Sequence, residues 1–325
     1  MNTRRDLLVH LALGALASSM ARAQQLPRTL GNLSPYSRLQ AEPFRPVFAQ
    51  AMRVLGYVEG TDYVGEDRFA DGNDRLLPAL ASELVSLKVD VIVTSTSNGA
   101  AAAQAATSSI PIVFEGVSDP VRFGFADSLA HPGHNLTGLS NLSGDLTNKR
   151  LAFLQQIIPK LHRVAVLVNP VNRNQSTFAA RLAAIAEQTG LELFPVNASA
   201  SEELEQAFQS IVQRHGEAVL VMPDGYFWRL GVRISELALR YRMPSMFAFP
   251  ESVEVGGLIG YGVDTFDSVR SQATYVSRIF KGAKPADIPI EQPTKIDLVI
   301  NRKTADALGL KIPRLILLQA TRVIE

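Results

Sequence analysis

The 325-residue chain contains no cysteine, a single tryptophan and five histidines. The absence of cysteine excludes disulfide frameworks, thiolate metal sites, cysteine nucleophiles and lipid attachment to a cysteine. The chain also lacks a charge imbalance, because 32 basic residues stand against 31 acidic ones. A nucleic-acid binder that relies on bulk electrostatic attraction needs an excess of positive charge, so we expect no nucleic-acid partner.

Long apolar runs are missing beyond the first 23 residues. Residues 1–23 combine Arg4 and Arg5, an apolar run over 7–20 and an ending of small residues at 21–23, which is the pattern of a secretory signal peptide. The arginine pair also fits a twin-arginine signal, and that route and the general secretory route both stay open. We therefore expect a periplasmic protein with no membrane span and no lipid anchor.

Signatures of catalysis are absent as well. The sequence has no Gly-x-x-x-x-Gly-Lys phosphate loop, no Gly-x-Ser-x-Gly nucleophile elbow and no His-Glu-x-x-His zinc motif. His131 and His134 flank a Pro-Gly pair, but two histidines without a cysteine or a nearby carboxylate pair make a poor metal site. We predict a protein that is not an enzyme, with no catalytic residues, no metal and no cofactor.

Short apolar runs alternate with amphipathic stretches along the rest of the chain. Runs rich in β-branched residues suit strands that are buried on both faces of a parallel sheet. These runs cover 89–94, 110–114, 164–168 and 218–222, and the amphipathic stretches cover 74–87, 172–189 and 264–281. The alternation predicts an α/β fold with doubly wound parallel sheets.

The order of these elements is repeated, once over about 56–119 and again over about 190–252. Any two α/β stretches share some of this pattern, but the repeat favours two similar doubly wound lobes joined by a hinge. We expect crossovers between the lobes at 131–143 and 250–257 and a further break at 281–293. We place the first lobe at 24–140 plus about 257–282, and the second at 141–256 plus about 283–325. The assignment of the residues after 283 stays open.

Polar side chains follow the predicted strands. In open α/β sheets, ligands bind beyond the carboxyl ends of the strands, next to the N-termini of the following helices. Such helix N-termini favour anions. Four consecutive small donors, Ser95 to Asn98, exceed what one helix cap requires. Asp224 is followed by three aromatic residues and could hold the ammonium of an amino-acid-like ligand, or simply cap a helix over core aromatics. The candidate ligand-binding residues are Ser34, Tyr36, Ser95, Thr96, Ser97, Asn98, Ser118, Asp119, Asn169, Asp224, Tyr226, Phe247 and Tyr261, with Phe249 nearby. Asp119, which precedes a proline, also reads as a helix cap.

Several stretches together resemble a known family along nearly the whole chain. They include 55–60 (LGYVEG), 118–121 (SDPV), 131–140 (HPGHNLTGLS), 282–287 (GAKPAD) and 291–295 (EQPTK). The family is that of ABC transporter substrate-binding proteins, which includes tryptophan/tyrosine-binding proteins. The resemblance implies a periplasmic binding protein type I-like fold and adds Asn141 to the ligand loops. Members usually have Pro-Gly-Gly-Asn where this chain has His134 in place of the second glycine.

The combined prediction is the periplasmic solute-binding component of an ABC importer. It would clamp a small solute between two lobes and deliver it to an ABC permease in the inner membrane. We expect a monomer whose ligand is an amino acid or another carboxylate, with a sugar-like solute still open. A sensory module that feeds a membrane receptor and, less readily, an enzyme on a two-lobed scaffold are the alternatives.

Overall fold

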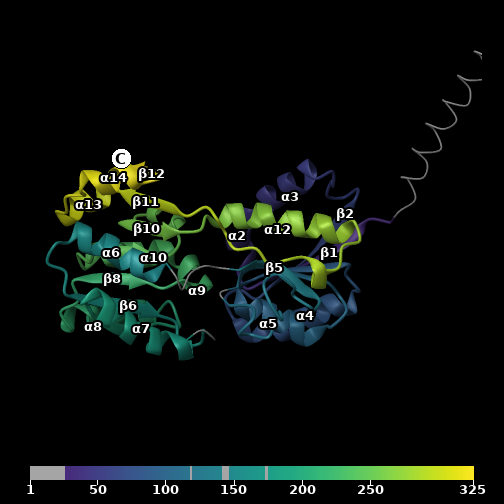
Figure 1. Ribbon diagram of the computed structural model, residues 1–325, viewed down its shortest axis with the longest axis horizontal. Coiled ribbons are helices and arrows are strands. Elements are labelled where there is room, and N and C mark those ends of the chain that lie inside the picture. Colours follow the sequence, from purple (N-terminus) through teal and green to yellow (C-terminus); the bar gives the residue numbers. More distant parts are fainter. Residues whose placement is uncertain (1–25, 118, 141–145, 173–174) are drawn as a thin grey trace, which may run out of the picture.

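The computed structural model describes residues 26–117, 119–140, 146–172 and 175–325, which form two α/β lobes lying side by side (Figure 1). The stretch expected to be a signal peptide lies outside the described residues. Within the described ranges, no helix combines the length and the apolar character that a membrane span requires. The predicted fold class is confirmed, because each lobe is built on its own mainly parallel sheet.

The first lobe contains a parallel sheet of five strands in the order β2-β1-β3-β4-β5. Its strands are β1 (Arg28–Ser34), β2 (Tyr63–Phe69), β3 (Val91–Ser95), β4 (Ile112–Val117) and β5 (Leu136–Ser140). Successive side chains of a strand point to opposite faces. In β3, Ile92 therefore packs with the helices on one face, while Val91 and Val93 pack with those on the other.

Helices cover both faces of this sheet. One face carries η1 (Asp74–Leu76), α4 (Leu77–Ser86) and α5 (Thr96–Ala106), and the other carries α2 (Arg38–Ala41), α3 (Phe44–Val54) and α12 (Thr265–Phe280). Helix α12 returns to this lobe from late in the sequence and lies beside α3 (Figure 1). Its apolar stripe, with Ala273 and Val276, supplies the core that the sheet needs on that side.

The second lobe contains seven strands in the order β12-β11-β10-β9-β8-β6-β7. They are β6 (Arg163–Val168), β7 (Glu192–Asn197), β8 (Ala218–Val221), β9 (Ser245–Phe247), β10 (Ile259–Gly262), β11 (Asp297–Asn301) and β12 (Arg322–Ile324). All neighbours are parallel except β10 and β11. The surrounding helices are α6 (Thr147–Ile157), α7 (Gln175–Thr189), α8 (Glu203–Gln213), α9 (Gly225–Arg229), α10 (Gly231–Arg240), α11 (Glu251–Glu254), α13 (Arg302–Leu308) and α14 (Arg314–Gln319).

The predicted repeat is visible in the topology. The order β2-β1-β3-β4-β5 of the first lobe is matched by β7-β6-β8-β9-β10 of the second. In this correspondence β3 and β8 hold the same central place, and each leads into a helix at the edge where the lobes meet. Equivalent loops of the two lobes therefore face each other.

The lobe boundaries differ from the predicted ones in two places. Residues 258–261, expected in the first lobe, belong to the second: Leu258 packs in its core and the others lie in β10, which hydrogen-bonds to β9 and β11. Residues 285–291, expected in the second lobe, pack on the first, where Ile288 and Ile290 join its core and Thr137 Oγ1 donates to the Ile288 carbonyl over 2.7 Å. The chain thus crosses between lobes after β5, after β10 and after Glu291. Strand pairing and apolar packing decide these boundaries, and neither is visible in a local pattern.

Candidate functional site

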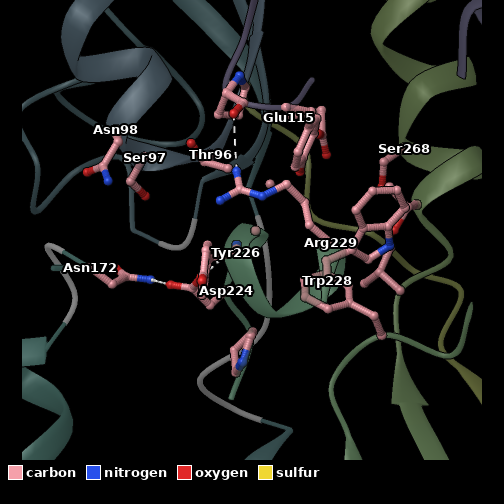
Figure 2. A pocket seen from close by; sticks show the side chains of 18 of the residues that line it. Thr96, Ser97, Asn98, Glu115, Asn172, Asp224, Tyr226, Trp228, Arg229 and Ser268 are labelled. Carbon is pink, nitrogen blue, oxygen red and sulfur yellow. Dashed lines mark hydrogen bonds between the residues drawn. The ribbon is translucent and has the colours of Figure 1, made fainter. Parts of the chain in front are cut away.

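A cavity lies between the lobes, at the carboxyl ends of the strands of both sheets, which is where open α/β sheets bind ligands. We call it the interlobe cavity. Figure 2 shows Thr96, Ser97 and Asn98 on one side of it and Asp224 with Asn172 on the other. The polar and aromatic residues of its lining are Tyr36, Asp74, Thr96, Ser97, Asn98, Glu115, Ser140, Asn169, Asn172, Asp224, Tyr226, Trp228, Arg229, Phe249, Thr265 and Ser268.

The wall of the first lobe is the N-terminus of α5. Ser95 occupies the N-cap position but makes no side-chain capping bond, whereas Thr96 Oγ1 accepts from the Gly99 N–H over 3.3 Å. The backbone N–H groups that precede Gly99 at the start of α5 have no partner within the helix and suit an anion. Thr96 has a φ of 66°, a left-handed conformation that is costly for a β-branched residue. Strain of this kind clusters at ligand sites, where the surrounding structure holds it in place.

Close packing holds this turn against its strand. A Cβ atom on Gly99 would come within 2.3 Å of Thr94 Oγ1, so glycine is required there. The Thr94 hydroxyl donates to the Leu33 carbonyl over 2.8 Å, and Asn98 donates to Asp74 over 2.8 Å. The first turn of α5 is thereby fixed in position before any ligand arrives.

The wall of the second lobe is centred on Asp224, which lies between β8 and α9 and is 8% exposed. Its carboxylate accepts from the Tyr226 backbone N–H over 2.7 Å and from the amides of Asn169 and Asn172. Burial raises the pKa of Asp224, while the bonds from the two asparagines and from the backbone oppose that shift. The asparagine amides and the backbone N–H favour the ionised form of the carboxylate, which is the form that binds a cation.

Aromatic rings join the two lobes beside this wall. The Trp228 ring lies 5.3 Å from Tyr36 and 5.0 Å from Phe44, measured between ring centroids. The Arg229 guanidinium packs over the Tyr36 ring at 5.8 Å and donates to the Pro35 carbonyl over 3.1 Å. These contacts join residues nearly 200 positions apart in the sequence, one from each lobe. The structure therefore shows the two lobes in a closed arrangement.

A second buried carboxylate, Glu115, lies at the end of β4 on the first-lobe side and is also 8% exposed. Burial raises the pKa of Glu115 to about 7, although a hydrogen bond from Ser95 acts in the opposite direction. The acidic Glu251 of the second lobe adds to the rise. The two buried carboxylates of the cavity therefore differ in their hydrogen-bond donors: Asp224 accepts from two asparagine amides, and Glu115 accepts from the Ser95 hydroxyl.

The structure brings many of the predicted site residues together. Tyr36, Thr96, Ser97, Asn98, Asn169, Asp224 and Tyr226 line the interlobe cavity, as does the nearby Phe249. Ser34 and Ser95 line a neighbouring cavity inside the first lobe. Ser118 and Asn141 lie outside the described residues.

Three predicted residues lie elsewhere. Phe247 is buried in the core of the second lobe, because side chains alternate along β9 and the one at 247 faces α8 and α10. Tyr261 packs its ring on Phe153, 5.1 Å away. Asp119 is exposed and accepts from the Arg122 N–H over 3.1 Å, but residues 120–124 form a turn and not the helix that the sequence suggested, so Asp119 caps a turn.

The prediction missed Glu115, Asn172, Arg229, Asp74, Thr265 and Ser268. Glu115 follows a run of buried apolar residues directly, and a charged residue at that point is a signal that could have been used. Arg229 follows the aromatic residues after Asp224, but its contact with Pro35 depends on how the lobes close. Ser268 and Thr265 come from α12, whose return to the first lobe was expected without a role at the site.

Taken together, the fold and site define a two-lobed solute-binding protein with a periplasmic binding protein type I-like fold. Residues 45–324 match the model of the family described as ABC transporter substrate binding protein. The chain belongs to that family, as its sequence motifs had indicated, and it is a substrate-binding protein of the ABC transporter class.

Relatives and solved structures agree with this assignment. The chain is 28% identical over 265 residues to the tyrosine-binding protein of Clostridioides difficile, covering 81% of this chain and 76% of that protein. A conserved domain protein from Vibrio cholerae has a TM-score of 0.85 at 26% identity, covering 92% of this chain and all of that one. A domain from Streptococcus pneumonia, solved in complex with L-Trp, shares the fold with a TM-score of 0.83 at 22% identity and the same coverage.

Proposed function

We propose that this protein is the exported binding component of an ABC importer and that it carries a small zwitterionic amino acid between its lobes. The observation that supports this most directly is the pairing of opposite chemistry across one cavity. The first turn of α5 offers backbone N–H groups from one lobe, and Asp224 offers a buried carboxylate from the other. A zwitterion needs both at once.

In the proposed complex, the ligand carboxylate lies at the N-terminus of α5, where N–H groups and the helix dipole favour an anion. The ligand ammonium lies at Asp224, in a buried charge-assisted hydrogen bond. The rings of Tyr36 and Trp228 are available to the ligand side chain. Because the ligand contacts both walls only when the lobes are closed, binding stabilises the closed form.

The relatives support an amino acid as the ligand class. One relative carries the name tyrosine-binding protein, and one structure with the same fold contains L-Trp. A ligand-free, open structure of a substrate binding protein from Clostridium difficile has a lower TM-score of 0.67 at 92% coverage of this chain. The lower score fits the interlobe contacts described above, which belong to a closed arrangement.

Export and delivery complete the proposal. The charged start, apolar run and small-residue ending of residues 1–23 support secretion to the periplasm, and the family supports a permease as the partner. Cleavage of the signal is checked by the intact mass of protein recovered from the periplasm, which should begin at Gln24. A recovered mass that still includes residues 1–23 would contradict this part of the proposal.

The ligand class is tested by a thermal-shift screen of amino acids, organic acids and sugars, followed by calorimetric titration. A ligand at a hundred times its dissociation constant stabilises the protein by about 2.7 kcal/mol. We expect amino acids to raise Tm, and Asp224→Asn to weaken binding about a hundredfold or more, since a buried charge loses its partner. Asp127→Asn, at an aspartate whose side chain is 70% exposed, is the control and should leave affinity unchanged. Binding of sugars alone, or full affinity in Asp224→Asn, would refute the proposal.

A further inference from the structure

A second cavity lies inside the first lobe, between its sheet and helices α2, α3 and α12. We call it the inner compartment. Aromatic residues form much of its wall, namely Tyr36, Phe44, Phe48, Tyr63 and Phe69. It adjoins the interlobe cavity, because Tyr36, Glu115 and Thr265 line both spaces. A ligand held between the lobes can therefore reach this boundary with its side chain.

Glu115 is the charged residue on that shared boundary. The Ser95 hydroxyl donates to it, and the charge of Glu251, which is also acidic, raises its pKa further. The other titratable groups that line the two cavities are Tyr36, Arg38, Glu42, Arg45, Glu59, Tyr63, Asp67, Asp74, Asp224, Tyr226 and Arg229. Glu251 lines neither cavity but acts on Glu115 through its charge.

The cations among these groups have partners of their own. Arg45 pairs with Glu59 over 2.8 Å, Arg38 packs over the Phe69 ring at 4.8 Å, and Arg229 donates to the Pro35 carbonyl. A buried carboxylate is an acceptor with several lone-pair sites, and leaving such a group poorly satisfied is costly. A donor on the bound solute would add to the hydrogen bond that Glu115 receives from Ser95.

We propose that Glu115 accepts a hydrogen bond from the side chain of the bound solute, and so selects amino acids whose side chain carries an N–H or O–H donor. This inference rests on the proposed function, because the zwitterionic end of the solute is taken to occupy α5 and Asp224. The aromatic walls on both sides of Glu115 enclose the apolar body of the side chain. A phenol, an indole N–H and an ammonium share the required chemistry, and the experiment below separates them.

Because Glu115 can be protonated, the affinity for a donor ligand should depend on pH. The pKa of Glu115 is raised to about 7 in the free protein, and a donor ligand favours the ionised carboxylate, which is the stronger acceptor. Binding then releases a proton at pH values below about 7. The affinity for a donor ligand should accordingly rise with pH up to about 7 and level off above it, by at most tenfold per pH unit.

The test compares three matched pairs in which one member lacks the side-chain donor. The pairs are tyrosine and phenylalanine, tryptophan and its sulfur analogue 3-benzothienylalanine, and lysine and norleucine. Calorimetric titration at pH 6 and pH 8 is run on the wild-type protein, on Glu115→Gln and on Glu83→Gln. Glu83 is 55% exposed and pairs with Arg68 on the surface, which makes it a suitable control.

In the wild type and the Glu83→Gln variant, the donor member of the pair that binds should be preferred at least tenfold at pH 8 and should bind more weakly at pH 6. In Glu115→Gln, the preference should fall below threefold and the pH dependence should disappear. The pair that binds identifies the donor. Equal affinity within every binding pair, or an unchanged preference in Glu115→Gln, overturns this inference alone. Binding of none of the six overturns this inference, and binding of no amino acid at all in the thermal-shift screen refutes the proposed function as well.

Discussion

The two lobes share one topology but present opposite chemistry to the cavity between them. The loop after β3 in the first lobe and the loop after β8 in the second hold equivalent places in their sheets. In the first, the Thr96 hydroxyl accepts from the Gly99 N–H over 3.3 Å, and the N–H groups before Gly99 are the ones proposed to meet the ligand. In the second, Asp224 caps α9 by accepting from the Tyr226 N–H and places a carboxylate at the cavity. One change in cap chemistry thus gives a repeated scaffold two differently charged walls.

The lobes also differ in how they support a buried carboxylate. Asn169 and Asn172 both donate to Asp224, whereas Glu115 of the first lobe receives a hydrogen bond from Ser95 and lies near another acid. Burial raises the pKa of both acids, and the amides of Asn169 and Asn172 oppose the rise at Asp224. At Glu115 the hydrogen bond from Ser95 opposes the rise and the charge of Glu251 adds to it.

The largest expected effect in this comparison is on stability as pH changes. The pKa of Glu115 is raised from 4.5 to about 7 in the folded protein. The folded state therefore binds more protons than the unfolded state between these values, and stability falls as pH rises from about 4.5 to about 7. The loss is on the order of 3 kcal/mol. Glu115→Gln should remove it and raise Tm by several degrees at pH 8, with little change at pH 5.

Calorimetric melting of the ligand-free protein at pH 5 and pH 8 checks this prediction. The Glu83→Gln variant serves again as the control, because an exposed surface pair contributes little to stability. A Glu115→Gln variant that melts at or below the wild-type temperature at pH 8 would show that the carboxylate is satisfied in the free protein. Glu115 and Asp224 would then not differ in how well their carboxylates are hydrogen-bonded.

The sequence predicted the shared features of the lobes better than their differences. Continuous β-branched runs located β3, β4, β6 and β8, and the polar residues after β3 and β8 led to both walls of the cavity. Those signals are local, since burial on both faces of a strand and the cap of the next helix depend on neighbouring residues.

Features that depend on which strands pair, or on how the lobes close, could not be predicted from local sequence patterns. The place of β10 is decided by hydrogen bonds to β9 and β11, and a lone strand pattern does not name its partners. Phe247 was predicted at the cavity, but the pleat of β9 turns it into the core. The contact of Arg229 with Pro35 exists because two distant loops meet when the lobes close.

A smaller effect is expected where the two equivalent loops touch. A Cβ atom on Gly225 would lie 2.9 Å from Thr96 Cγ2 and 3.4 Å from the Tyr36 hydroxyl. Gly225→Ala should therefore destabilise the closed form by about 1–2 kcal/mol through overpacking, and lower ligand affinity about tenfold. Each lobe should keep its fold, because the strain arises between lobes.

Calorimetric titration measures the affinity, and the melting temperature of the ligand-free protein reports on the fold. A second substitution, Thr96→Ser, removes the methyl group in the way and should restore most of the affinity in the double variant. Thr96→Ser alone is the matched control. Loss of affinity that the double variant does not recover would show that Gly225 acts through its own lobe and not across the cavity.

The smallest effect is expected at the loop after β4, where the lobes differ again. The corresponding loop of the second lobe brings Phe249 to the cavity, but Asp119 of the first lobe is exposed and accepts from the Arg122 N–H. Asn caps as well as Asp does, so Asp119→Asn should change stability by less than about 0.5 kcal/mol and affinity by less than twofold. Titration with the preferred amino acid measures this. A tenfold loss of affinity would instead show that Asp119 contacts the ligand, as its position after a strand had suggested. The loop after β4 would then contribute to the site, as the corresponding loop of the second lobe does.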